Sequence, residues 1–220
     1  LKTKARSAEI WHADSGSREK ASVHSMGKGT SITLTMERDD AQFIILSTGN
    51  NISGAPAATR PEGEKICTID GPWEIAFQTG RGAPEKATFE NLGSYTASED
   101  EGIRYFSGTA TYVRHFTFTD SGTDNLWLDL GDVRNMARVS LNGTDLGLAW
   151  KSPYRLSTAG ALKKGDNELR IEVTNSWANR LIGDEQPGVG ERITYTSHPF
   201  YTADSPLVPS GLLGPVCIIR

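Results

Sequence analysis

The chain has 220 residues, with 23 Lys and Arg against 27 Asp and Glu and a formal net charge of −4. This length allows one large or two modest domains with a substantial core. The near balance of charge, without a basic block, excludes nucleic acid as an expected partner. No apolar stretch approaches the ~20 residues of a membrane-spanning helix, and no signal pattern precedes the first strand. Because the chain begins at Leu1, we expect a piece of a longer protein.

Short apolar runs separated by polar turn residues predict strands in the first fifty residues. We expect them at Glu9–His12, Ala21–His24, Ser31–Met36 and Gln42–Leu46. So few strands make a partial β-sandwich over residues 1–50, whose apolar face must pack on another part of the protein. Residues 51–64, rich in Gly, Pro and Ala, have the composition of a linker.

A second, larger all-β module is predicted over residues 65–220. Trp73, Ile75 and Phe77 alternate with polar residues, which is typical of a half-buried strand. Further strands are expected at residues 66–70, 88–93, 109–119 and 126–130. In the strand at 109–119, Tyr112, Arg114, Phe116 and Phe118 share one side. In the strand at 126–130, Leu126, Leu128 and Leu130 do so. Residues 98–101 are acidic and predict a solvated loop. No stretch shows helical periodicity of useful length.

The stretch from Asn135 to Trp177 predicts a β-hairpin, an aromatic loop and a long returning strand. Ala137, Val139 and Leu141 share one side of a strand, and Asn142-Gly143 tolerates the positive φ angles of a type I′ turn. Leu146 resumes the apolar side. After a second turn predicted at Gly165-Asp166-Asn167, three more alternating apolar residues follow: Leu169, Ile171 and Val173.

These motifs resemble a known family. The order Leu-Asn-Gly, Ser-Pro-Tyr, Gly-Asp-Asn-Glu-Leu and Val-Thr-Asn is similar to the galactose-binding-type jelly roll, or sugar-binding domain, of glycoside hydrolase family 2. Residues 175–184 and 209–216 resemble the C-terminal module of large α-L-rhamnosidase-like enzymes, as in family 106. The resemblance runs from about Asp70 to Arg220. It implies an antiparallel β-sandwich or jelly roll, a larger parent hydrolase chain as partner, and a periplasmic or extracellular setting.

Cys67 and Cys217 are too few for a disulfide framework and too far apart in sequence for a metal site. Two buried thiols are the favoured interpretation. The first and last strands of a jelly roll can be neighbours, so a disulfide between them stays open, to be decided by the distance between their α-carbons.

Catalytic chemistry has little support in the sequence. Glycoside hydrolysis needs two carboxyl groups on either side of one bond, and no such pair stands out. Most acids, including Asp129, Asp132, Asp145, Glu172 and Glu185, are expected as surface groups or turn caps, whereas Asp184 is expected to pair with Arg180. The four histidines lie in no nucleophile or metal motif, so we expect no metal and no cofactor. A structural calcium would need only loop oxygens, and the sequence places none.

Sugar binding asks for an aromatic ring against the apolar face of a pyranose and for polar groups that bond its hydroxyls. Near predicted strand ends, Trp150, Tyr154, Trp177, Asn179 and Arg180 supply that mixture, and they are our candidate sugar-binding residues. The alternative is that these aromatic rings plug the ends of the sandwich. The loop containing His198-Pro-Phe-Tyr201 is long enough to carry function or mobility.

Three interpretations compete. In the first, the chain is a non-catalytic carbohydrate-binding module of an α-L-rhamnosidase-like glycoside hydrolase that acts on plant or microbial polysaccharide. In the second, it braces the parent enzyme and binds no sugar, which an apolar patch without a cleft would favour. In the third, the chain is itself catalytic, which would require a close carboxylate pair in a deep pocket. We favour the first, while fold alone does not establish it.

Overall fold

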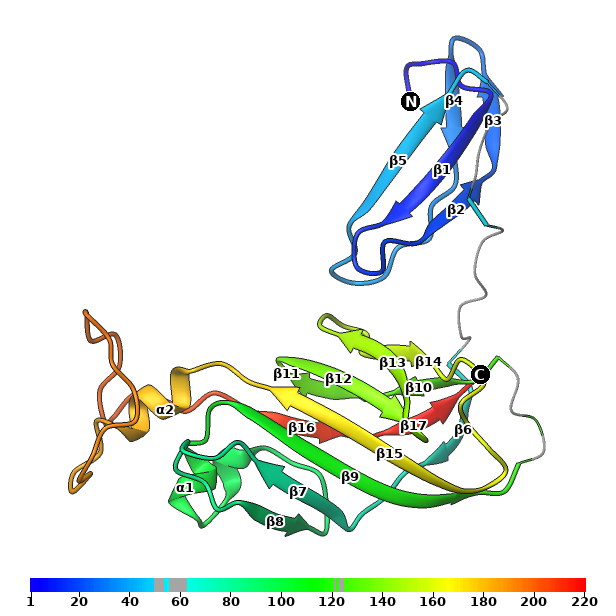
Figure 1. Cartoon of the computed structure of the whole chain (residues 1–220). Helices are drawn as coiled ribbons and strands as arrows, with labels where there is room; N and C mark the ends of the chain where they lie inside the picture. Colours follow the sequence, from blue (N-terminus) through cyan, green and yellow to red (C-terminus); the bar gives the residue numbers. More distant parts are fainter. Residues whose placement is uncertain (50–53, 56–62, 121, 123–124) are drawn as a thin grey trace. The chain divides into compact units, whose positions relative to one another are not determined.

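The computed structural model describes residues 1–49, 54–55, 63–120, 122 and 125–220. The chain divides into two compact units, Leu1–Arg60 and Pro61–Arg220 (Figure 1). Each unit is described by itself. Most of the segment predicted as a linker, 51–64, lies outside the described residues. Strands dominate both units, so the predicted all-β class is confirmed. In the described residues no helix is long and apolar enough to cross a membrane.

The first unit contains an antiparallel sheet and a separate hairpin. The sheet has the order β2-β1-β5, with β2 at Arg18–Ala21, β1 at Ser7–His12 and β5 at Gln42–Ser47. The hairpin pairs β3 (Val23–Met26) with β4 (Gly29–Ile32). Phe43 and Ile45 are exposed on β5, so one face of the sheet presents apolar side chains to solvent.

Two predicted strands of this unit differ from the structure. The strand expected at Ala21–His24 is divided between β2 and β3. The strand expected at Ser31–Met36 ends at Ile32, because Ile32 pairs with Val23, the first residue of its partner strand. Beyond that pair, Met36 has no strand to join and its side chain is exposed.

The second unit is built on a six-stranded antiparallel sheet. Its order is β13-β12-β15-β9-β7-β8, with β13 at Thr144–Ala149, β12 at Met136–Leu141, β15 at Gly165–Thr174, β9 at Thr109–Phe118, β7 at Trp73–Phe77 and β8 at Lys86–Phe89. The long strands β9 and β15 pair over their whole length. They form the centre of the sheet in Figure 1.

A smaller layer completes the sandwich. It has the order β14-β10-β17-β6, with β14 at Arg155–Ser157, β10 at Trp127–Asp129, β17 at Cys217–Ile219 and β6 at Lys65–Thr68. A further pair joins β11 (Asp132–Arg134) to β16 (Gly211–Gly214). The described helices are short: η1 (Tyr95–Ala97), α1 (Glu101–Arg104) and α2 (Ala178–Gly183). The predicted acidic loop ends by capping α1, since Asp100 Oδ1 accepts from the N–H of Ile103 at 3.2 Å.

One buried cluster fills the space between the layers. The apolar side chains of four of the predicted alternations are buried in it: Trp73, Ile75 and Phe77; Leu126, Leu128 and Leu130; Ala137, Val139 and Leu141; Leu169, Ile171 and Val173. Fully burying one Leu, Ile or Phe side chain contributes about 1.5–3 kcal/mol. The predicted jelly-roll-type sandwich is therefore confirmed, with its core where the period-2 pattern expects it.

The hairpin turn adopts the predicted geometry, with φ of 52° at Asn142 and 79° at Gly143. A β-bulge lets Leu146 stand between the pairs Val139–Gly147 and Ser140–Asp145, and its side chain packs against the core. The turn predicted at residues 165–167 is wrong, because β15 already begins at Gly165.

A tyrosine pair ties three segments together inside the core. The hydroxyl of Tyr112 on β9 donates to the hydroxyl of Tyr95 on η1 at 2.6 Å. It also accepts from the N–H of Leu212 on β16 at 3.1 Å. Burial raises the pKa of Tyr112 far above its usual range. The two hydroxyls therefore stay protonated and serve as a neutral polar link.

The two cysteines are free. Their strands are neighbours, as expected, but Cys67 lies opposite Ile218 while Cys217 lies opposite Thr68. Because residues one step apart point to opposite faces of a sheet, the two thiols face away from each other. This register leaves the disulfide unformed.

Candidate functional site

Strand register brings Trp150 and Trp177 to the same end of the large sheet, where β13 and β15 finish. We call this end of the sheet the tryptophan edge. Ala137 on β12 lies opposite Ala149 on β13 and opposite Val173 on β15. Trp150 therefore leaves the sheet beside one side of β12, and Trp177 follows the strand on the other side. Two strand spacings separate these exits, roughly 10 Å.

Both indoles are open to solvent, 49% exposed for Trp150 and 43% for Trp177. The guanidinium carbon of Arg81 lies 4.6 Å from the centre of the Trp177 ring. A cation at that distance is attracted by the ring and covers part of one face. The edge thus offers aromatic surface with a positively charged hydrogen-bond donor already in place.

Tyr154 lies in the loop that joins β13 to β14. Its ring is partly buried against the core, and its hydroxyl donates to the backbone oxygen of Asn135 at 3.2 Å. Asn135 immediately precedes β12, so this bond holds the aromatic loop against the same end of the sheet. Because its ring is partly buried, Tyr154 can border a ligand at this edge, but it is less suited to stacking its ring face on one.

The structure places Asn179 away from this edge. It is 1% exposed on α2, where its side-chain amide donates to the backbone oxygen of Val208 at 2.8 Å and accepts from the N–H of Val208 at 2.9 Å. These bonds fasten α2 to the segment before β16. Asn179 is thus used internally, and we remove it from the candidate sugar contacts.

Arg180 is likewise buried, at 6% exposure, beside Asp184 at 4%. The predicted ion pair is confirmed, with Arg180 Nε 3.0 Å from Asp184 Oδ1, although the two atoms are not aligned as a hydrogen bond. Gly183 makes room for the pair, since a Cβ there would lie 2.5 Å from Arg180 Nη2. Arg180 therefore also leaves the candidate site, as a structural residue.

Asp184 fastens the long loop that follows α2. Its Oδ2 accepts from Ile193 N at 3.1 Å, from Thr194 N at 2.7 Å and from Thr194 Oγ1 at 2.5 Å. Burial alone would raise the pKa of Asp184, but these hydrogen bonds and the Arg180 charge outweigh it and lower the pKa below its usual value. The carboxylate stays charged at neutral pH.

The fastened loop, residues 184–210, extends beyond the sandwich next to α2 (orange in Figure 1). Sequence reasoning expected a long loop here without foreseeing its anchors. Tyr195 is 91% exposed and Phe200 is 77% exposed, and the His198 ring meets the Phe200 ring edge-on at 5.0 Å. The loop thus combines a buried ionic anchor with exposed aromatic rings.

The acids expected at the surface are mostly paired with arginines. Asp129 lies 2.7 Å from Arg155 Nε and also accepts from Gly131 N in a turn. Asp132, Asp145, Glu172 and Glu185 each lie beside an arginine. Within the described ranges, no group of three or more His, Cys, Asp or Glu is arranged to hold a metal ion.

This fold and its motifs define a class. Residues 94–203, half of the chain, match the family described as "Glycosyl hydrolase 2 galactose-binding domain-like", and the chain belongs to that family. The solved rhamnosidase from Novosphingobium sp. PP1Y is 41% identical with a TM-score of 0.85, and the match covers 100% of this chain and 21% of that one. The resemblance to a rhamnosidase module is therefore confirmed.

A curated protein from Formosa agariphila, named "Putative beta-glucuronidase", is 33% identical, over 87% of this chain and 20% of that protein. The chain thus spans about one fifth of the length of the relatives it matches. The chain therefore corresponds to a part of such longer proteins.

Proposed function

We propose that this chain is a non-catalytic carbohydrate-binding module of a rhamnosidase-like glycoside hydrolase, and that Trp150 and Trp177 contact the sugar. The observation that carries the proposal is the placement of two half-exposed indoles at one edge of a rigid sheet. Trp150 directly follows β13 and Trp177 lies three residues beyond the end of β15, so the sheet positions the segments that carry both side chains.

The chemistry of the edge suits a pyranose. An indole ring packs on the apolar C–H face of the sugar, while Arg81, held over Trp177, has N–H groups to donate to hydroxyls. Tyr154 would border the ring from the loop side. One shallow contact of this kind gives weak binding by itself, so we expect it to help retain a polymeric substrate near the parent enzyme's active site.

The parent protein is part of the same proposal. Relatives named as a rhamnosidase and as a putative glucuronidase suggest plant or microbial polysaccharide as the substrate of a longer chain that acts in the periplasm or outside the cell. The module itself would need no cofactor.

A bracing role is the second candidate. Tyr195 and Phe200 are strongly exposed on a loop that is anchored by buried charge, and exposed apolar side chains mark surfaces that pack on a partner. In this alternative the module supports the parent's catalytic domain and the tryptophans have no ligand.

Calorimetric titration with L-rhamnose, D-galactose and pectin-derived oligosaccharides separates the two. We expect saturable heat in the millimolar range, weakened at least about tenfold by Trp150→Ala or Trp177→Ala, which corresponds to about 1.4 kcal/mol. Phe43→Ala, an exposed aromatic of the other unit, is the matched control and should change nothing. Absence of heat with every sugar would leave the bracing role.

A further inference from the structure

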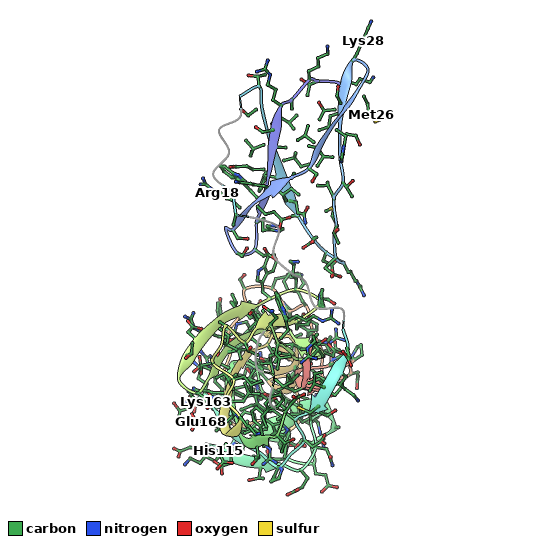
Figure 2. All side chains as sticks on the ribbon, turned by 90° about the vertical axis from the view of Figure 1, so that its right-hand side faces the viewer. Arg18, Met26, Lys28, His115, Lys163 and Glu168 are labelled. Atoms are coloured by element: carbon green, nitrogen blue, oxygen red, sulfur yellow. The ribbon has the colours of Figure 1, made fainter. Side chains whose placement is uncertain are left out.

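The first unit carries an apolar groove between its hairpin and its three-stranded sheet. The groove has a volume of about 460 Å³, and its apolar side chains are Leu1, Met26, Ile32, Leu34 and Ile44. Met26 lies at the tip of the hairpin beside Lys28 (Figure 2). Ile44 belongs to β5, the last strand of its sheet, which pairs on one side only among the described residues. The partial sandwich is therefore open along this groove.

The register of the hairpin decides which backbone groups of β4 face outward. Met26 pairs with Gly29 across a two-residue turn, and Ser25 pairs with Thr30. Such a turn is closed by a hydrogen-bonded pair, and bonded and non-bonded pairs then alternate along the strands. The N–H and C=O groups of Gly29 therefore point to β3, whereas those of Thr30 and Ile32 point away from it. These groups form an edge that a further strand can join.

Leu1 already pairs with this edge. Its nitrogen donates to Thr30 O at 2.8 Å, and Thr30 N donates to Leu1 O at 3.0 Å. Two residues that exchange both bonds form an antiparallel pair, so the chain at Leu1 runs opposite to β4. The Thr30 hydroxyl also accepts from Ala5 N at 2.9 Å, which holds the segment after Leu1 in place. A strand leading into Leu1 would therefore run alongside residues 31–36.

Residues 31–36 carry the pattern of a strand beyond the point where β4 ends. Ile32 and Leu34 are half-buried, whereas Thr33 and Thr35 are exposed, as in a strand with one covered face. Yet β4 stops at Ile32, because β3 begins opposite it on the other side. Among the described residues, only Leu1 bonds the backbone of the outer edge over residues 30–34. A partner strand on that edge would give the alternation the pairing that β3 does not supply.

We propose that the residues leading into Leu1 in the longer protein form an extended strand that pairs antiparallel with residues 30–36 and fills the groove. Such strand addition combines main-chain hydrogen bonds with side chains that enter a groove at every second residue. The chain spans about one fifth of the length of its relatives, so most of the longer protein lies outside it and can supply the strand. The inference uses no part of the proposed sugar binding.

The register fixes which side chains of this strand enter the groove. When the pair of Leu1 and Thr30 is continued, the residue two positions before Leu1 lies opposite Ile32, and the residue four positions before it lies opposite Leu34. Opposite residues of an antiparallel pair share one face, so both side chains should be apolar. Proline is excluded at both positions, because each N–H donates to β4. The coding sequence of the longer protein checks this first, and a charged residue or proline at both positions would overturn the proposal.

Amide exchange followed by NMR tests the pairing itself. The chain is compared with a form extended by the residues that precede Leu1 in its own coding sequence, about eight of them, which is an ordinary strand length. A form with a Gly-Ser extension of the same length is the control. We expect the natural extension to slow exchange of the Ile32 and Leu34 amides at least about tenfold. The Thr33 amide should be slowed much less, because its N–H points to the other edge, and the Gly-Ser form should behave like the unextended chain.

Leu34→Asp in the extended chain is the decisive variant, and Thr35→Asp is its matched control. Leu34 lines the groove, whereas Thr35 is exposed. The first substitution places a charge against the apolar side of the added strand, so the exchange of Ile32 should return to that of the unextended chain. Thr35→Asp should keep the slowed exchange. The amide signals of β1 and β5 show in each variant that the three-stranded sheet is intact.

Three results of the exchange experiment would overturn the proposal. The first is equal exchange of the Ile32 and Leu34 amides in the natural and Gly-Ser forms. The second is equal slowing of Thr33, which would show coverage of the segment without strand pairing in this register. The third is slowed exchange in the unextended chain that grows with protein concentration, together with a dimer in sedimentation velocity, since a second copy would then occupy the edge.

Discussion

Replacing Asp184 by Asn tests the buried anchor of the long loop. Asn keeps the size of the side chain but removes the charge opposite Arg180, whose side chain is almost fully enclosed. Removing one partner of a buried ion pair typically costs 3–5 kcal/mol. Because Asn can still accept from Thr194, we expect the lower end, about 3 kcal/mol. For a unit of this size, that lowers the melting temperature by roughly 6–12 °C.

Glu172→Gln is the matched control. Glu172 also pairs with an arginine, Arg170, at 2.9 Å, but both side chains are well exposed, and such pairs contribute about 0.2–1 kcal/mol. Differential scanning calorimetry, following the transition of the larger unit, compares the two variants. Equal small shifts in both would refute the argument that Asp184 is held as a buried counter-charge.

Because of the same anchor, the difference in unfolding free energy between Asp184→Asn and the unmodified chain should depend on pH. The pKa of Asp184 is lowered in the folded state, so its contribution is fully present above the ordinary carboxyl value, near pH 4. It is lost as the pH falls through the lower folded value. The gap in stability between the two proteins should therefore be constant from pH 5 to 7 and shrink on acidification. A gap that grows at low pH would contradict the assigned direction.

Two further expectations concern groups inside the sandwich. Tyr112→Phe should destabilise the unit by about 1–3 kcal/mol in chemical denaturation, because it leaves the buried N–H of Leu212 without an acceptor; Tyr95→Phe, which leaves that bond intact, should cost less, and equal losses would count against the assignment. Burial raises the pKa of Cys67, so at pH 8 its alkylation by iodoacetamide, followed by peptide mass spectrometry, should be several-fold slower in the native than in the denatured chain; equal rates would show an accessible thiol.

Local patterns were sufficient for several strands of the larger unit. Ala137, Val139 and Leu141 and the turn at Asn142-Gly143 could be predicted, because period-2 burial and positive φ are properties of a few neighbouring residues. The end of the strand predicted at residues 31–36 was wrong. Its end is set by the length of the partner strand and not by its own sequence.

The predicted turn at residues 165–167 failed for a related reason. Asn167 favours turns in isolation, yet here it is buried in β15. Its side chain accepts from Lys163 N at 2.9 Å and donates to Lys163 O at 2.8 Å, so it stabilises the loop that precedes it from within the strand. The residue type indicated a nearby turn, while the position of that turn depended on hydrogen bonds that sequence spacing does not specify.

The candidate site divides in the same way. Trp150 and Trp177 were predicted from their aromatic character near strand ends, and in the structure both side chains are about half exposed. Asn179 and Arg180 were predicted as sugar contacts because amide and guanidinium groups can bond sugar hydroxyls. They are buried instead by a six-residue helix that has no periodic signature, and Asn179 bonds Val208, 29 residues away.

The position of β17 has a consequence for the order in which the larger unit assembles. This strand, Cys217–Ile219, lies between β10 and β6 and pairs with both, although β6 precedes it by about 150 residues. The smaller layer therefore lacks the strand between β10 and β6 until nearly all of the unit has been synthesised. Until then, β6 has no partner strand. Deleting residues 217–220 should remove the strand that joins β10 to β6, and the partly uncovered inner face of the large sheet would then favour aggregation over folding.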